Sequence, residues 1–111
     1  MNNEEIAGLV SLLEAEVNNG GFDQFFFNSS GDKTAEIMKA LQLIGALKTA
    51  DMVKRAAAKF PGGMPPKEWA KRQDLLVDEV SPEADAFQEM DREFYSGPEN
   101  LSDLVNKYIT R

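Results

Sequence analysis

The sequence predicts an all-α fold, a compact bundle of six to seven helices that forms a single domain over residues 1–111. Apolar residues recur at intervals of three and four along the whole chain, and no segment alternates between apolar and polar residues as a half-buried strand would. Glycine and proline residues separate the apolar-periodic segments, as expected for turns between helices. A chain of 111 residues that is 42% hydrophobic is long enough to bury one core.

The first helix is predicted at residues 3–17. Asn2 stands before it as an N-cap, and Glu5 follows three residues later in the pattern of a capping box. Gly20 and Gly21 are expected to end this helix, because glycine enters the left-handed backbone region without a steric penalty.

A second, short helix is predicted at residues 22–28 and a third at residues 33–46. Gly31 is expected to end the short helix, and Asp32 is expected to cap the third. Gly45 lies inside the third predicted helix, where glycine costs about 1 kcal/mol relative to alanine. We therefore expect another helix to cross closely at Gly45.

Helices four and five are predicted at residues 50–60 and 66–80. The segment 61–66 between them contains three prolines and two glycines, which favours a loop. Small alanines on the inward face of the fourth helix are typical of a close helix crossing.

Two further helices complete the predicted bundle. Ser81 and Pro82 fit the N-cap and the first position of a sixth helix that extends to about residue 95. Gly97 and Pro98 end that helix, and a last helix is predicted to run to about residue 110. Four aromatic residues have the spacing of core or rim positions: Trp69, Phe87, Tyr95 and Tyr108.

The chain contains no histidine and no cysteine. Without these residues neither the serine and cysteine triads nor zinc sites with His or Cys ligands can form. We therefore predict that the protein is not an enzyme and that it has no cofactor and no metal. One enzymatic alternative uses carboxylates alone, with a pair chosen from Glu14, Glu16 and Asp23. A divalent-cation site is another alternative, because acidic residues flank a predicted helix junction at Asp78, Glu79, Glu83 and Asp85.

The sequence gives no indication of a membrane-spanning segment, because it has no apolar run of about 18 residues. Its first residues are acidic rather than basic and do not resemble a signal peptide. We therefore expect a cytoplasmic bacterial protein that does not bind membranes.

Charge is sorted along the chain. The net charge is −6 over residues 1–32, +6 over residues 33–73 and −7 over residues 74–111. Acidic residues in the last third stand four apart, and like charges at this spacing destabilise a helix by about 0.2–0.5 kcal/mol per pair. Such a pattern needs compensation. The candidates for a partner-binding acidic surface are Asp74, Asp78, Glu79, Glu83, Asp85, Glu89 and Glu93.

Three interpretations of this acidic surface remain open. It keeps the protein soluble, it pairs with cations of the basic middle segment, or it meets a basic partner. The cations available for internal pairing are Lys48, Lys54, Arg55, Lys59, Lys71 and Arg72. Direct binding of nucleic acid is not expected, because a net charge of −7 opposes association with a polyanion.

A glycine- and phenylalanine-rich motif follows the first helix. Phe22, Phe25 and Phe26 fall on one helical face, while Gln24 and Asn28 are neighbours on another, where their amides could bond loop backbone. We interpret the motif as a folding device: a sharp corner and an aromatic plug. A binding pocket floored by the phenylalanines is the alternative. The motif residues are Gly20, Gly21, Phe22, Gln24, Phe25, Phe26 and Asn28.

The pattern Gly-Gly-Phe-x-Gln-Phe-Phe-x-Asn at residues 20–28 resembles the signature of the bacterial DNA-mimic protein family, also catalogued as a domain of unknown function. The likeness runs from about Glu16 to the C-terminus and includes Ala40-Leu41 and residues 44–46. It implies an all-helical protein, and a homodimer that engages a transcription factor through acidic surface residues, as described for a member of that family.

We therefore predict a non-enzymatic acidic interaction protein that binds a basic protein, a DNA-binding regulator, as a DNA mimic. One alternative is an immunity-type protein that neutralises a toxin, which would be small and acidic for the same reason. The other is a purely structural domain.

Overall fold

A computed structural model describes all residues from Met1 to Arg111. It contains six α-helices and no strand, so the all-α prediction is confirmed. None of the helices is long and apolar enough to cross a membrane. The elements in chain order are α1 (Asn3–Phe27), the 3₁₀ turn η1 (Ser29–Lys33), α2 (Thr34–Leu43), α3 (Leu47–Ala57), the 3₁₀ turn η2 (Pro61–Gly63), α4 (Trp69–Leu75), the π-helical turn η3 (Leu76–Val80), α5 (Gln88–Tyr95) and α6 (Leu101–Ile109).

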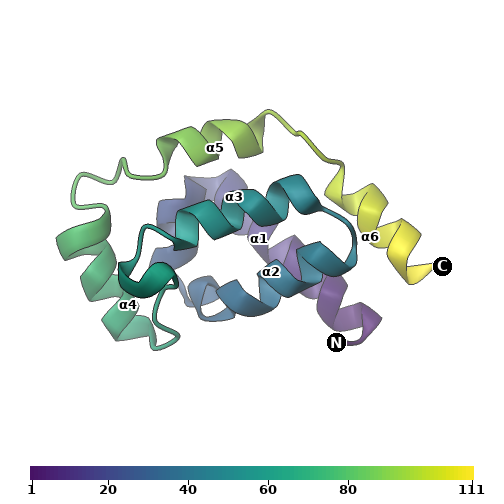
Figure 1. The fold of residues 1–111 in the computed structure, drawn as a ribbon, viewed down its shortest axis with the longest axis horizontal. Helices are drawn as coiled ribbons and strands as arrows, with labels where there is room; N and C mark the ends of the chain where they lie inside the picture. The colour runs from purple at the N-terminus through teal and green to yellow at the C-terminus, as the bar shows by residue number, and fades with distance from the viewer.

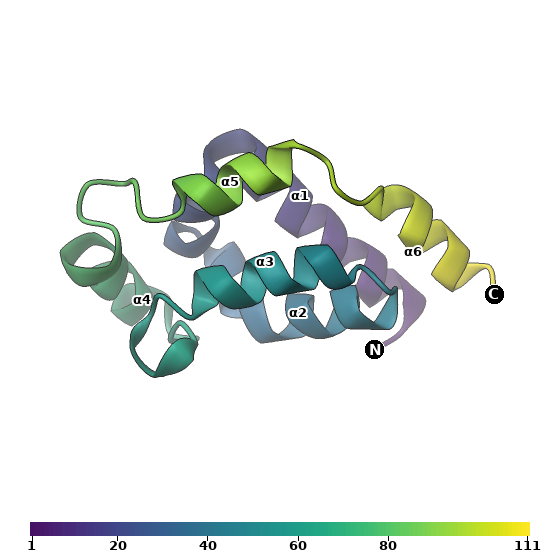
Figure 2. The same cartoon turned by 45° about the horizontal axis from the view of Figure 1, so that its top comes forward.

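The helices form an elongated bundle built on α1, with dimensions of 44 × 27 × 22 Å. α2 and α3 lie side by side on one face of α1, and α5 packs on both α1 and α3 (Figures 1 and 2). α4 and α6 lie at opposite ends of the molecule, and the N-terminus shares the end with α6 (Figure 1). α1 therefore contacts α2, α4, α5 and α6, whereas α3 packs on α2 and α5. The C-terminal end of α1 lies against α4.

The core is one cluster of 23 buried residues centred on phenylalanine rings. Phe22, Phe25 and Phe26 of α1 are fully buried. The ring of Phe26 lies 5.0 Å from that of Phe60 and 5.3 Å from that of Phe87, between centroids. The motif thus provides the aromatic centre of the core, and the alternative of a pocket floored by these three rings does not form.

The first two predicted helices form the two halves of α1, which meet at a sharp corner where Gly20 and Gly21 have non-helical backbone angles. Gly21 has φ +72°, in the region that disfavours residues with a side chain. A Cβ at Gly21 would also lie 2.5 Å from Oδ2 of Asp91. Gly20 has ordinary extended φ, but a Cβ there would lie 2.2 Å from Oε1 of Gln24. Gly21 is therefore needed for both its backbone conformation and the space that it leaves, whereas Gly20 is needed for space.

Gly45 is not in a helix interior, contrary to prediction. It has φ +78° just after the end of α2, where the N–H of Ala46 donates to the carbonyl of Leu41 at 2.8 Å. The N–H of Gly45 donates to the carbonyl of Gln42, which completes a Schellman C-cap. A Cβ at Gly45 would meet nothing within 4 Å, so no helix crosses there.

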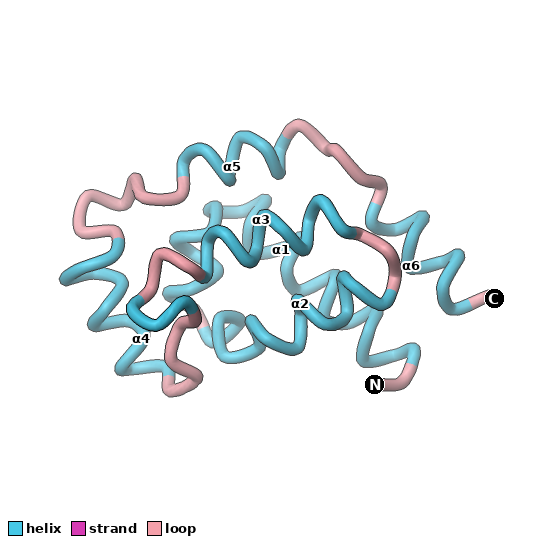
Figure 3. The backbone as a smooth tube through the Cα atoms, viewed as in Figure 1, coloured by secondary structure: helices cyan, strands magenta, loops and turns pink.

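The predicted sixth helix begins later than expected. Residues 81–87 form a loop and α5 begins at Gln88 (Figure 3). Ser81 does not cap a helix: its N–H donates to Leu76 and closes the π turn, while its Oγ accepts from the N–H of Ala86 at 3.2 Å. The fourth and fifth helices also differ in their bounds, because α3 ends at Ala57 and α4 begins only at Trp69.

Gly21→Ala is expected to lower the free energy of unfolding by more than about 1 kcal/mol. The new side chain would be strained at positive φ and would press against the Asp91 carboxylate. Chemical denaturation of the variant and the wild type measures the effect.

Gly8→Ala is the matched control. Gly8 lies inside the same helix, and a Cβ there would meet nothing within 4 Å, so we expect stabilisation by up to about 1 kcal/mol. Equal stability changes in both variants would show that the corner places no special demand on Gly21.

Candidate protein-interaction surface

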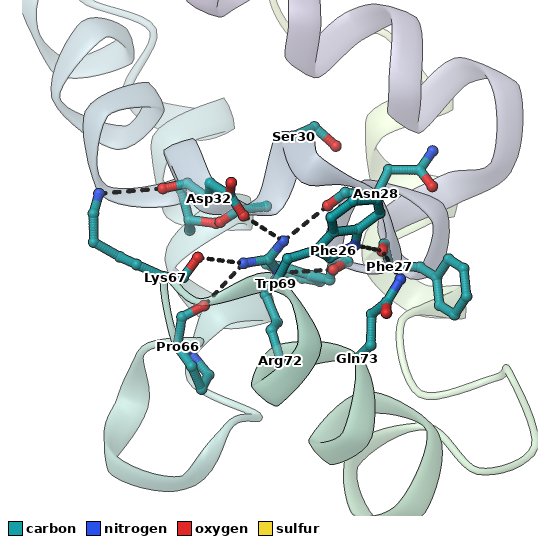
Figure 4. Close-up of polar contacts among 12 residues, drawn as sticks. Phe26, Phe27, Asn28, Ser30, Asp32, Pro66, Lys67, Trp69, Arg72 and Gln73 are labelled. Carbon is teal, nitrogen blue, oxygen red and sulfur yellow. Dashed lines mark hydrogen bonds and ion pairs between the residues drawn. The ribbon is translucent and has the colours of Figure 1, made fainter.

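The C-terminal end of α1 is capped by side chains from α4. The last carbonyls of a helix have no partner within the helix and need one elsewhere. Nε of Arg72 donates to the carbonyl of Phe26 at 2.8 Å. Nε1 of Trp69 and Nε2 of Gln73 both donate to the carbonyl of Phe27, at 2.6 and 2.9 Å (Figure 4). α4 is therefore attached to the motif by its polar side chains.

Arg72 is fully buried and uses all five of its N–H donors. Besides the bond to α1, its guanidinium group donates to the carbonyls of Pro66, Lys67 and Asn28, and to Oδ1 of Asp32 at 2.7 Å. These acceptors belong to three separate segments that surround one side chain (Figure 4). A buried cation is tolerated here because every donor is satisfied and one partner is a carboxylate.

Gly31 and Asp32 serve Arg72 rather than helix ends, contrary to prediction. Gly31 is buried in η1, and a Cβ there would lie 2.5 Å from Nε of Arg72. Asp32 accepts from the guanidinium group, and α2 begins after Lys33 without a side-chain cap. Arg72 was expected to be available for pairing with the acidic surface, whereas it is buried and pairs with Asp32. Nothing in the local sequence around Arg72 indicates its burial.

The motif amides bind a carboxylate instead of loop backbone. Nε2 of Gln24 and Nδ2 of Asn28 both donate to Oε2 of Glu16, at 2.7 and 3.2 Å. Glu16 precedes the glycine corner and both amides follow it. The interaction therefore ties the two halves of α1 together across the corner.

α5 is fixed to the same corner and to α3. Oδ1 of Asp91 accepts from the N–H of Phe22 at 2.9 Å, and the hydroxyl of Tyr95 donates to the carbonyl of Val17 at 2.7 Å. Glu93 forms a two-pronged ion pair with Arg55 at 2.7 and 3.1 Å. Burial is the main cause that raises the pKa of Asp91 above its ordinary 3.8, against the lowering effect of the Phe22 bond.

Four aromatic residues were predicted for core or rim positions. Tyr108 is partly buried and packs against the core, and the other three divide into two groups. Phe87 is fully buried, whereas Trp69 and Tyr95 are about half exposed. Both exposed residues use their polar atoms to bond carbonyls of α1. Their position follows from this amphipathic character, which apolar spacing does not reveal.

The seven predicted acidic residues lie along one continuous stretch of chain. Six are exposed and have no cation within 4.0 Å: Asp74 on α4, Asp78 and Glu79 in η3, Glu83 and Asp85 in the loop, and Glu89 on α5. Glu93 is neutralised by Arg55, so pairing with the basic middle segment occurs at this position alone. Asp85 lies outside α5, and the predicted helical row of Asp85, Glu89 and Glu93 is therefore wrong.

An open groove of about 440 Å³ adjoins these acidic residues. It lies between the second half of α1 and the η3 turn with its following loop, and Asp23, Phe27, Val77 and Ala84 are among its lining residues. Phe27 is 46% exposed and Val77 51%. No lysine or arginine lines the groove. Asp23 and Phe27 occupy the two x positions of the motif. Neither residue was among the motif residues singled out from the sequence.

Asp23 lies in an acidic environment within the groove. Burial raises the pKa of its carboxyl above the ordinary 3.8, a hydrogen bond with Ser81 lowers it, and the negative charge of Asp85 raises it. Ala84 on the opposite wall has φ +56° and is the only non-glycine residue with positive φ. The loop that forms this wall is therefore held in a strained conformation.

The carboxylates of the enzymatic alternative do not share a cavity. Asp23 lines the groove described above, Glu14 lines two other depressions, and Glu16 lines none because its carboxylate binds the motif amides. No group of three or more Asp or Glu side chains is placed to hold a metal ion, so the acidic residues around the η3 turn do not converge.

The fold places the chain in the class of small all-α proteins. Its characteristic contacts are the glycine corner closed by α5, the phenylalanine core, and Arg72 with its five hydrogen bonds, which we call the arginine clamp. The family model described as DMP19-like protein matches residues 2–111, and the chain belongs to this family. The resemblance drawn from the motif is thereby confirmed. No curated protein and no solved structure matches the chain significantly.

Arg72→Met is expected to destabilise the fold by about 3–5 kcal/mol, because it leaves a carboxylate and several buried carbonyls without their donor. Urea denaturation measures the change. Lys71→Met is the matched control; Lys71 is exposed and makes no hydrogen bond, so a change within about 0.5 kcal/mol is expected. A small effect of Arg72→Met would contradict the clamp.

Asp91→Asn is expected to change how stability depends on pH. Since burial raises the pKa of Asp91 in the folded protein, its protonated form favours folding. That contribution is fully present below about pH 3.8 and is lost as the pH rises through the folded-state pKa. Asparagine does not titrate and can still accept from Phe22.

Denaturation curves at about pH 4 and about pH 7 test this expectation. The quantity to compare is the free energy of unfolding of Asp91→Asn minus that of the wild type. This difference should be larger at about pH 7 than at about pH 4. The other carboxylates are the same in both proteins, and among them only Asp23 has a charge that also raises the pKa of Asp91. Removal of the Asp91 charge weakens that repulsion, which changes the difference in the same direction. A difference that stays constant with pH would contradict the raised pKa.

Proposed function

We propose that this protein is a non-enzymatic interaction protein whose acidic surface binds a basic DNA-binding protein in place of DNA. The observation that carries the proposal is the set of six exposed carboxylates between residues 74 and 89 that have no cation partner. Membership in the DMP19-like family supports it.

The acidic surface is complementary in charge to a protein surface that binds DNA. Duplex DNA carries one negative charge per about 1.7 Å of axis, and proteins that bind it present lysine and arginine to its phosphates. The six carboxylates offer negative charge to the same kind of surface. They follow a path over α4, η3, the loop and α5 rather than a straight helical row. Such a surface would match a basic cleft through its overall distribution of negative charge, and not through a regular row of carboxylates spaced like phosphates.

The fold holds the acidic stretch in a fixed position. Both ends of the acidic stretch are attached to α1, through Arg72 at one end and through Asp91 and Tyr95 at the other. Charges held in place before binding lose little conformational entropy on association. This favours a role in binding over a role in solubility alone, for which no fixed geometry is needed.

Affinity capture with the immobilised chain tests the proposal. Basic proteins retained from a lysate of the source organism at low salt should be released by added duplex DNA and by high salt, because both compete with or screen the carboxylates. A toxin bound by an immunity-type protein would be released by salt, but not by duplex DNA unless the toxin itself binds DNA.

A charge-reversed pair sharpens the test. Glu83→Lys combined with Glu89→Lys should abolish capture, because it reverses two of the six free carboxylates. The fold should be unaffected, since both residues are exposed and make no hydrogen bonds. Glu4→Lys combined with Glu5→Lys changes the net charge equally at exposed positions in the first turn of α1, and should leave capture intact. Equal loss in both variants, or release that duplex DNA does not cause, would contradict the proposal.

A further inference from the structure

The groove beside the acidic surface contains apolar side chains that are about half exposed. Phe27 is the one phenylalanine whose ring pairs with no other aromatic ring. Its ring points away from the Arg72 cluster, although its carbonyl belongs to that cluster (Figure 4). Val77 lines the same groove and is half exposed. Exposed apolar side chains gathered in one depression are typical of an interaction site.

Asp23 places a negative charge beside the exposed ring. Asp23 and Phe27 stand four residues apart on the same helix, so their side chains are neighbours on one face, and both line the groove. The Asp23 carboxyl is partly buried, lies near Asp85 and has no ion pair. A cation bound here would find a carboxylate that lacks a counter-charge.

The opposite wall is formed by a strained segment. Ala84 adopts positive φ, and residues 81–87 keep this conformation through the bonds of Ser81 to Leu76 and Ala86. Backbone strain at a non-glycine residue is common at binding sites, where the fold holds a shape that the local sequence does not prefer.

We propose that this groove binds an arginine side chain of the basic partner, with the guanidinium group stacked on Phe27 and paired with Asp23, and a neighbouring apolar residue of the partner against Val77. Arginine fits better than lysine because its planar group stacks on an aromatic face and binds a carboxylate through two donors. The inference rests on the proposed function, since it takes the partner to be a basic protein. It adds a short-range anchor to the long-range attraction of the acidic surface.

A labelled twelve-residue peptide of alternating arginine and leucine is the probe, and fluorescence anisotropy with the full chain gives its affinity. Two matched peptides carry citrulline or lysine in place of every arginine. Citrulline keeps the planar shape without the charge, and lysine keeps the charge without the planar shape. We expect the arginine peptide to bind most tightly, and the citrulline peptide to lose at least about tenfold.

Two variants test the groove residues. Asp23→Asn and Phe27→Leu should each weaken the arginine peptide by about tenfold, because one removes the charge and the other removes the aromatic face. The matched controls are Glu4→Gln and Leu47→Ala, a carboxylate and an apolar side chain exposed elsewhere, which should change affinity by less than about twofold. Circular dichroism melts of all four variants establish that each is folded.

The outcomes separate this inference from the proposed function. If the Glu83→Lys, Glu89→Lys protein binds the peptide weakly while Asp23→Asn and Phe27→Leu bind it normally, the groove inference is wrong and the acidic surface stands. If both groove variants lose the peptide while the charge-reversed protein still captures the same proteins from lysate, the groove stands and the proposed function fails. Equal binding of the citrulline peptide, or association of two chains that only Phe27→Leu abolishes, would overturn the inference.

Discussion

The guanidinium group of Arg72 joins two regions that lie far apart in the sequence: residues 26–32 and the loop just before its own helix. Its five hydrogen bonds reach the end of α1, the η1 turn and the loop before α4. A buried cation with all its donors satisfied is costly to break, because any missing partner leaves an uncompensated charge in the core. The position of α4, and with it the start of the acidic surface, depends on this side chain together with the bonds of Trp69 and Gln73 to the carbonyl of Phe27.

The glycine corner at Gly20 and Gly21 plays the corresponding role for α5. Without side chains at the corner, the Asp91 carboxylate can approach the backbone of α1 and bind the N–H of Phe22. The acidic stretch is therefore held at both ends by the backbone of residues 22–28 of the motif. Fold and proposed function are linked in this way, since residues that build the core also position the charges and the groove beside them.

The helices could be predicted from the sequence because apolar spacing reports which residues face the core, and the burial of Phe22, Phe25 and Phe26 follows from it. The loop at residues 81–87 could not be predicted, because the N–H of Ser81 closes the π turn before it and its Oγ accepts from Ala86, and a Ser-Pro pattern does not distinguish these bonds from an N-cap. The burial of Arg72 could not be predicted either. Its local sequence resembles any exposed helix, and only the distant Gly31 and Asp32 reveal its burial. The acidic residues could be listed, but their freedom from cations, except at Glu93, is a property of the fold.

Hydrogen exchange of the Arg72 Nε–H, followed by nuclear magnetic resonance, tests the clamp most directly. The account predicts that this proton exchanges as slowly as the core amides of α1, because it is fully buried and bonded to the carbonyl of Phe26. The side chain of Arg92, which is exposed and makes no hydrogen bond, provides the internal reference for free exchange. Exchange of the Arg72 proton at the rate of Arg92 would contradict the account.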